Sequence, residues 1–296
     1  MWRMRVLTDE QWLLIEPLLP SSDGLRGRPF RDHRQVIEGI VYRARTGVPW
    51  RDLPDEFGPW QTVWKRHRRF SGDGTYDLIL AVLAAAADAR GEVEWDCSVD
   101  STVNRAHQHA APSRGTQGDR SNYTNPREEP ADHALGRSRG GLSCKVHALV
   151  DGRGLPLVVL LGPGNGGDSP VLPDLLDGLS VARPGPGRPR TRPDALLGDK
   201  AYCSRAHHRM LRARGIKVVI PERDDQKAHR AAKGSAGGRP RSLDEELYKL
   251  RNVVERFFNR IKQWRAVATR YDKLALTYRG TVVLAGIRLW LQALTK

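Results

Sequence analysis

The sequence predicts an α/β fold in which helices flank a mixed sheet and a small all-α domain of the helix-turn-helix kind precedes it. Three observations support this prediction. Residues 1–91 show patterns of short helices joined by turns, residues 92–220 alternate strand and helix patterns, and residues 243–294 hold two long apolar-faced helical patterns. A chain of 296 residues accommodates two domains, which we expect at residues 1–91 and 92–296.

The N-terminal helices carry their own start and stop signals. Thr8-Asp-Glu-Gln11 is a capping box, and Gly47-Val-Pro-Trp50 ends a periodic stretch that begins near residue 31. A third helix, Trp60–Phe70, mixes aromatic and cationic side chains and is the candidate recognition helix of a helix-turn-helix module. Its candidate DNA contacts are Lys65, Arg66, Arg68 and Arg69. A plain solvated basic face is the alternative reading of the same helix.

Strand patterns begin at residue 93. Val93–Asp100 alternates apolar and polar residues and ends on an acid, and two further runs flank the tight turn 151–154 as a hairpin. A buried strand, Ala195–Asp199, ends on another acid. Helical patterns at 169–179 and 204–214 and a strand pattern at 216–220 complete the alternation, which predicts a mixed sheet with helices on its faces.

The last third carries the most informative helix. Residues 222–242 read as a basic, Gly-rich loop that orders on DNA, and one continuous helix follows at about 243–264. On that helix the spacing Tyr-x2-Arg-x3-Glu-x6-Lys places four side chains within an arc of roughly 60°. They are Tyr248, Arg251, Glu255 and Lys262. A salt-bridged surface stripe is the alternative, since Arg251 and Glu255 are one helical turn apart.

Charge is distributed unevenly along the chain. The net charge is +15, and residues 184–296 hold 26 of the 49 Lys and Arg but only 10 of the 34 Asp and Glu. A cationic excess beside the Glu255 helix indicates a bound polyanion such as DNA. An arginine-rich coding bias is the alternative source of part of this excess.

Composition argues against several other classes. Cys97, Cys144 and Cys203 are too few and too widely spaced for a disulfide framework, and a zinc cluster of Cys203 with His207 and His208 lacks a second ligand pair. The start of the chain lacks the apolar segment of a signal peptide, and no apolar stretch approaches the roughly 18 residues that span a bilayer. We therefore expect a soluble, cytoplasmic protein with no membrane partner.

Three acids are candidates for metal chemistry. Asp100 and Asp199 each end a predicted strand, and ligands gather at the carboxyl ends of neighbouring strands. Together with Glu255 they can hold two Mg²⁺ ions, or Mn²⁺ as a substitute, about 3.5–4 Å apart. Each aspartate alone is more commonly a turn former or a helix cap. The combination beside a basic surface favours phosphodiester chemistry.

Several sequence landmarks occur in a fixed order and are specific to one family. They are Leu7–Trp12, Gly47–Pro54, Asp100–His107, Arg137–His147, Gly198–Tyr202 and the Tyr248–Lys262 helix. With these landmarks the chain resembles DDE-type insertion-sequence transposases of the insertion-sequence-five group, which have an RNase H-like catalytic core. The resemblance covers essentially the whole chain.

The resemblance implies a reaction and roles for residues. Asp100, Asp199 and Glu255 would be the metal ligands, and Tyr248, Arg251 and Lys262 the supporting residues near the DNA ends. The partners would be the terminal inverted repeats and target DNA, bound by a homodimer. Further candidate DNA contacts are Arg137, Arg139, Lys145 and Lys200.

Some alternatives stay open at this stage. His107 and His109 either touch substrate or metal or simply pack, and Trp264 either stacks on a base or belongs to the core. An RNase H-like nuclease without strand transfer is the nearest rival function. A domesticated DNA-binding regulator that no longer cuts is the rival from another class.

Overall fold

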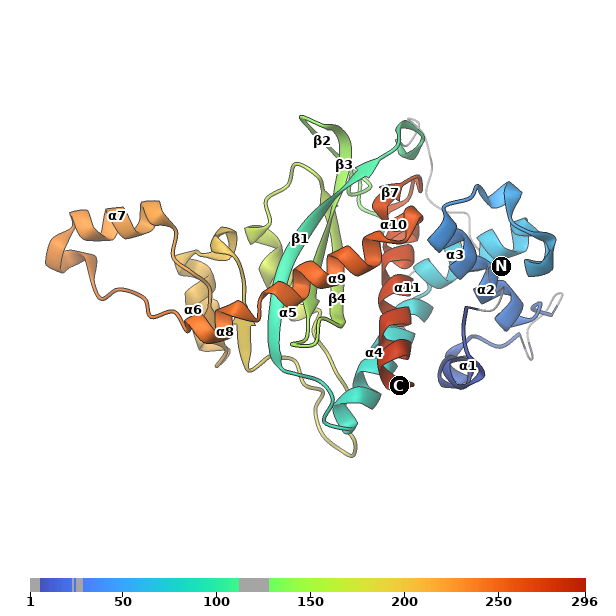
Figure 1. Cartoon of the computed structure of the whole chain (residues 1–296), viewed down its shortest axis with the longest axis horizontal. Helices are drawn as coiled ribbons and strands as arrows, with labels where there is room; N and C mark the ends of the chain where they lie inside the picture. Colours follow the sequence, from blue (N-terminus) through green and yellow to red (C-terminus); the bar gives the residue numbers. More distant parts are fainter. Residues whose placement is uncertain (1–5, 23, 25–28, 112–127) are drawn as a thin grey trace.

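The computed structural model of the protein describes residues 6–22, 24, 29–111 and 128–296 (Figure 1). Helices precede and flank a mixed sheet, so the predicted α/β architecture with a helical N-terminal region is confirmed. The strands are β1 Asp96–Ala106, β2 Gly136–Ser138, β3 Gly141–Val150, β4 Pro156–Pro163, β5 Ala195–Leu197, β6 Lys217–Val219 and β7 Thr269–Arg270. The helices are α1 Asp9–Ile15, α2 His33–Thr46, α3 Trp60–Gly72, α4 Thr75–Ala89, α5 Leu172–Asp177, α6 Arg205–Ala213, α7 Asp224–Ala232, α8 Glu245–Lys249, α9 Asn252–Lys262, α10 Arg265–Ala268 and α11 Ala275–Leu294.

The sheet has its long strands on one side of β1 and its short strands on the other. β3 pairs antiparallel with β1, and β4 pairs antiparallel with β3 across the predicted hairpin. On the opposite edge of β1, β5 and then β6 follow in parallel. β5 meets only the first three residues of β1, and β7 joins the same edge at Arg105. In the described chain no strand pairs with that edge between Val99 and Asn104, so the sheet is open there.

One continuous core links the N-terminal helices to the sheet. α11 packs against α3 and α4 and also against β4. Arg279 of α11 holds both sides together, because its guanidinium donates to Asp77 of α4 at 3.0 and 2.7 Å and to the Val159 carbonyl of β4 at 2.8 Å. The helices α1 to α4 therefore share their core with residues 275–294. A division into two domains at residue 91 stays a prediction.

A buried histidine lies in the interface between α3 and α11. The His67 ring contacts the Tyr76 hydroxyl at 3.0 Å and the Thr281 hydroxyl at 3.1 Å, and burial lowers its pKa to about 4. The unfolded chain protonates this histidine near pH 6.5, whereas the folded chain resists protonation until about pH 4. Its contribution to stability is thus complete above pH 6.5 and is lost as the pH falls toward 4.

This linkage gives a test of the α3–α11 interface. His67→Gln keeps one donor and one acceptor but cannot be protonated, so its melting temperature should fall less between pH 7 and pH 5 than that of the parent. Between pH 7 and pH 5 the free energy of unfolding of the parent should fall by roughly 2 kcal/mol more than that of the variant. Differential scanning calorimetry at the two pH values measures it. Parallel pH profiles for the parent and the variant would show that His67 is not the titrating group.

Two elements differ from the sequence prediction. The segment 222–242, expected to be a loop, contains α7, whose Asp224 and Asp225 lie in its first turn and whose His229 and Arg230 lie in its last, as the helix dipole favours. The expected continuous helix 243–264 is divided into α8 and α9, because i to i−3 hydrogen bonds tighten the chain at Leu250 and Arg251. The capping box that starts α1 is present as predicted.

Helix α9 lies across β1 and β3, where Figure 1 shows it crossing in front of the strands. Its buried side chains Val254 and Phe257 face the core, while Glu255 is exposed. The β3–β4 turn closes tightly beneath the start of this helix. Gly154 adopts φ +79°, and an added Cβ there would lie 3.0 Å from the Val253 carbonyl oxygen. None of the helices in the described ranges has the length and apolar character needed to cross a bilayer.

Candidate active site

Two aspartates lie alongside each other at the open edge of β1. The parallel register pairs Ser98 of β1 with Leu197 of β5, so continuing it by two residues brings Asp199 beside Asp100. The prediction that Asp100 ends its strand is wrong, because pairing with β3 carries β1 on to Ala106. The two acids are still close enough for the charge of Asp199 to raise the pKa of Asp100.

Arg251 joins two of the three candidate acids. Its Nη1 donates to Asp100 Oδ2 at 3.0 Å, and its Nη2 donates to Glu255 Oε1. Arg251 comes from the tightened turn between α8 and α9, and Glu255 follows one turn later on α9. The guanidinium therefore bridges the strand carboxylate and the helix carboxylate, and it is largely buried while it does so.

The electrostatics of Asp100 reflect this enclosure. Burial is the largest influence and raises the pKa of its carboxyl group, and the nearby charge of Asp199 raises it further. The Ser101 amide, which donates at 2.7 Å, and the Arg251 guanidinium both lower it. The net direction is upward, so the ionised form of Asp100 is less favoured here than in water. A bound cation would relieve this cost.

Lys262 and Tyr248, the other two residues of the Tyr-x2-Arg-x3-Glu-x6-Lys pattern, have different surroundings. Lys262 Nζ donates to the Thr102 hydroxyl at 2.6 Å and to the Val103 carbonyl at 3.2 Å, two and three residues beyond Asp100 on β1. Burial lowers the pKa of this lysine. Tyr248 lies on α8, where its ring packs with the small cluster around Leu197 and stands 6.0 Å from the Arg251 guanidinium carbon. Arg251, Glu255 and Lys262 therefore lie along β1, whereas Tyr248 packs against the cluster around Leu197.

The acids match the chemistry of a divalent metal site. Their donors are all carboxylate oxygens, which Mg²⁺ and Mn²⁺ prefer. Within the described residues, no three His, Cys, Asp or Glu side chains are arranged to hold one metal ion, and this covers Cys203, His207 and His208. At the acids, Arg251 is the group that stands between Asp100 and Glu255. That Asp100, Asp199 and Glu255 together hold a metal ion stays a prediction.

The cations predicted on the recognition helix have unequal surroundings. Lys65 is exposed, whereas Arg66 is buried: its guanidinium lies over Phe30 and contacts His33 at 2.9 Å, and burial lowers its pKa to about 10. Arg68 lies over Trp64, and Arg69 pairs with Asp73 at 3.2 Å. DNA contact by these residues stays a prediction, which the exposure of Lys65 favours and the burial of Arg66 does not.

The remaining predicted DNA contacts are also partly exposed and partly buried. Arg137 and Arg139 are exposed on the β2–β3 hairpin. Lys200 is exposed and pairs with Asp224 of α7 at 3.0 Å. Lys145 is largely buried, and its ammonium donates to Asp168 and to the Gly166 carbonyl, both at 2.8 Å. Lys145 therefore fixes the loop after β4 in this structure.

That loop supplies a residue the sequence reasoning missed. Asp168 accepts a hydrogen bond from the Ser101 hydroxyl at 2.6 Å as well as from Lys145. Ser101 follows Asp100 on β1, so Asp168 contacts the residue next to Asp100 in the sequence, whose side chain points to the opposite face of the strand. Burial raises its pKa, but the hydrogen bonds from Lys145 and Ser101 hold it below its ordinary value overall. Only its position after a Gly-rich turn marked it in the sequence.

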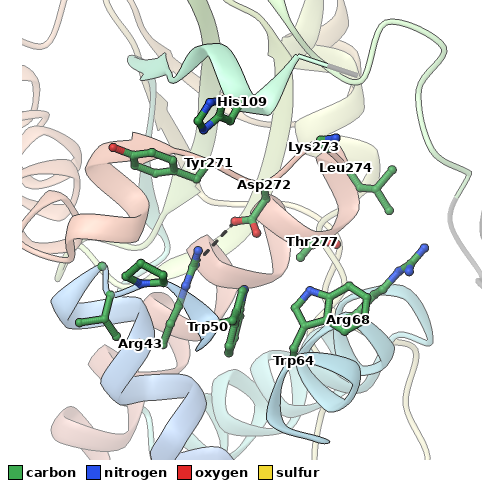
Figure 2. A pocket seen from close by; sticks show the side chains of 13 residues that line it. Arg43, Trp50, Trp64, Arg68, His109, Tyr271, Asp272, Lys273, Leu274 and Thr277 are labelled. Carbon is green, nitrogen blue, oxygen red and sulfur yellow. Dashed lines mark ion pairs between the residues drawn. The ribbon is translucent and has the colours of Figure 1, made fainter. Parts of the chain in front are cut away.

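A cavity of about 790 Å³ lies at the other end of β1, between the N-terminal helices and residues 271–277 (Figure 2). Trp50, Trp64 and Tyr271 line it, and Arg43 pairs across it with Asp272 at 3.8 Å. The two candidate histidines belong here and not with the acids. His109 lines the cavity, and His107 stacks on Tyr271 with ring centroids 4.7 Å apart. Trp264 belongs to the core.

Comparison with known families assigns the chain. Residues 7–80 match a family described as a putative transposase of the IS4/5 family, and residues 92–290 match the family described as the transposase DDE domain. The chain belongs to the transposase DDE domain family. The resemblance found in the sequence is thereby confirmed, and the transposase is an enzyme of the DDE type. Membership implies dependence on a divalent metal ion.

Individual relatives agree with this assignment. A putative transposase of insertion sequence element IS6501 from Brucella ovis is 32% identical over 151 residues, which are 51% of this transposase and 100% of that protein. A putative transposase of IS402 from Burkholderia cepacia is 33% identical over 139 residues, 47% of this chain and 57% of the other. The uncharacterised protein y4sN of Sinorhizobium fredii is 41% identical over 115 residues, 38% and 87% of the two chains.

Proposed function

We propose that the transposase binds the terminal inverted repeats of an insertion sequence, hydrolyses one phosphodiester at each end and joins the freed 3′-OH to target DNA. The convergence of Asp100 and Asp199 at the open edge of β1 supports this proposal most directly. The uneven charge supplies the attraction, because 26 cations against 10 acids lie in residues 184–296.

Asp100, Asp199 and Glu255 would hold two Mg²⁺ ions, for which Mn²⁺ can substitute. When bound, such ions activate the attacking oxygen and stabilise the leaving oxygen of a phosphodiester. The two aspartates are fixed by β1 and by the turn after β5, where Asp199 accepts from the Ala201 amide at 2.9 Å. Glu255 has the freedom to adjust, since 48% of its side chain is exposed.

Arg251 would act by changing partners. In the present arrangement its two Nη atoms neutralise Asp100 and Glu255. Once those carboxylates are otherwise neutralised, the same planar fork is free to donate to two oxygens of the scissile phosphate. Arg256 and Arg260 are exposed on the same helix and would contact neighbouring phosphates. Lys262 would hold β1, the strand that carries Asp100, in place through its hydrogen bond to Thr102.

The N-terminal residues 1–91 would recognise the element ends as a domain of their own, with Lys65 as an exposed phosphate contact. Two ends must be processed together, so we expect two copies of the transposase on one pair of ends. Light scattering of the protein mixed with end-containing DNA measures this stoichiometry.

One assay separates the proposed reaction from its rivals. Purified transposase is incubated with Mg²⁺, a duplex that carries the element end and a supercoiled target plasmid. Products with a free 3′-OH, followed by species joined to the plasmid, support transposition. Hydrolysis without joined products supports a nuclease, and binding without cleavage supports a regulator. Replacing Mg²⁺ by a chelator should stop both steps while leaving the DNA complex detectable.

A further inference from the structure

A cavity of about 370 Å³ between helix α6 and residue 241 is lined by cationic and imidazole side chains alone. These residues, which form the arginine pocket, are Arg205, His208, Arg209, Arg212 and Arg241. Arg205, Arg209 and Arg212 are spaced so that α6 carries their guanidiniums on one face. Arg241 reaches the pocket from the segment after α7 and donates to Cys203 Sγ at 3.1 Å. Two parts of the chain that are distant in sequence thus bring their positive charges together.

The four arginines of this pocket form no ion pair with any of the described residues. Arg214, on the same helix but outside the pocket, does pair with Asp177, at 2.7 Å. Glu222 is the acid whose charge reaches His208, and it is already paired with Arg230. Like charges held together repel one another, so the arginine pocket favours an anion that enters from outside the chain.

The wall of the arginine pocket also contains an unpaired nitrogen. His208 is 6% exposed, and within the part of the chain that the structure describes its Nδ1 has no hydrogen-bond partner, whereas Nε2 lies 3.8 Å from Cys203 Sγ. Burial is the main influence that lowers the pKa of this histidine to about 4, and the charges of Arg241 and Arg212 contribute. Buried polar atoms are normally paired, so the unpaired nitrogen indicates that a ligand completes the pocket.

The arginine pocket adjoins the turn that carries Asp199. Cys203, which both Arg241 and His208 contact, follows Asp199 by four residues. Their Cα atoms are therefore at most about 14 Å apart. Phosphates of one DNA strand follow each other at about 3.4 Å along the duplex axis, so this distance corresponds to roughly four base pairs. DNA held at Asp199 would have other phosphates within reach of the pocket.

We propose that the arginine pocket binds a phosphate of the DNA backbone. The planar guanidiniums donate to its oxygens from several directions, and they supply the charge that a phosphodiester needs. This inference rests on the proposed function, because it takes DNA as the anion. It adds an anchor that holds the duplex beside the turn of Asp199. A free phosphate ion has the same chemistry, and the experiment separates the two sources.

The test compares two variants of helix α6 that each remove one positive charge. Arg209→Gln removes a guanidinium of the pocket, and Arg214→Gln removes one that lies outside it. General attraction to DNA therefore changes equally in both. Affinity for a duplex of arbitrary sequence, measured by fluorescence anisotropy without metal, should fall roughly tenfold in Arg209→Gln. The slope of log affinity against log salt should become shallower by roughly 0.9, which corresponds to one lost phosphate contact. Arg214→Gln should stay close to the parent in both measurements.

Stability and free phosphate give two further readouts. The melting temperature of Arg209→Gln should be no lower than that of the parent, because the substitution relieves repulsion among like charges. A lower melting temperature would overturn the inference, since it would show that the guanidinium already has a partner within the chain. Isothermal titration with inorganic phosphate examines the other source. Phosphate binding that Arg209→Gln abolishes, together with parental duplex affinity in that variant, would overturn the assignment to DNA.

Equal duplex affinities and equal salt slopes in Arg209→Gln and Arg214→Gln would also overturn the inference. The proposed reaction can fail separately, because the binding measurements contain no metal and require no cleavage. A parent that cleaves no DNA, with a salt slope that only Arg209→Gln reduces, would contradict the reaction and leave the phosphate site in place.

Discussion

Asp199→Asn and Asp100→Asn should each reduce DNA cleavage by at least about 10³-fold, the scale on which loss of a principal electrostatic group acts. A bound cation needs the ionised carboxylate, and the amide has nearly the same shape without the charge. Binding of end-containing DNA should change little, because both acids contribute negative charge. Gel-based cleavage and filter binding with the same duplex measure the two effects separately.

Stability gives a second readout for Asp100. Burial raises the pKa of this carboxyl group, so its charge disfavours the folded state at neutral pH. The melting temperature of Asp100→Asn should therefore be no lower than that of the parent. Asp225→Asn is the control, since Asp225 pairs only locally with Arg223 on the exposed helix α7. Cleavage at the parental rate by either active-site variant would remove that aspartate from the proposed set of ligands.

Arg251→Ala should reduce cleavage by about 10²–10³-fold with little change in DNA affinity, because the lost donor acts on the phosphate where charge develops. The Coulombic influence of Arg251 lowers the pKa of Asp100, so its removal raises that pKa. A carboxylate must be ionised to bind metal, so if Asp100 is a ligand as proposed, the loss of activity on acidification should begin at a higher pH in the variant. Rates measured from pH 5 to pH 9 test both effects.

Arg251→Lys distinguishes charge from geometry. A lysine keeps the positive charge but cannot donate to Asp100 and Glu255 from two separate nitrogens of a planar fork. Its rate should lie between those of the parent and Arg251→Ala, with a smaller shift of the acid limb. Parental rates in both variants would instead support the salt-bridged surface stripe as the whole role of this pair.

The three acids are candidates from the sequence because their signals are local. Asp199 follows a short apolar strand, and Glu255 stands on a helix whose apolar positions repeat with the helical period. Asp100 was predicted as a site residue from the end of its strand, and that premise is wrong, since the strand continues under the pairing with β3. Strand length is set by partners that are distant in the sequence, and periodicity does not report them.

Other features depended on tertiary contacts that no local pattern reveals. Lys145 reads as a surface cation, yet the fold directs its ammonium onto Asp168. The apparent single helix 243–264 is divided at Leu250 and Arg251, which sets Tyr248 against the cluster around Leu197. Helix α7 was missed because Gly and Lys around it outweighed nine residues with ordinary helical preferences.

The contacts of α11 set the order in which the chain can finish folding. Residues 275–294 leave the ribosome after every element they pack against, including α3, α4 and β4. Until then the apolar faces of α3 and α4 have no partner from α11, so the N-terminal helices complete their core only after Asp100, Asp199 and Glu255 have been synthesised. A nascent chain that stops before residue 275 would keep those faces exposed to chaperones and proteases. The N-terminal helices and the sheet that carries the acids would thus complete their packing together.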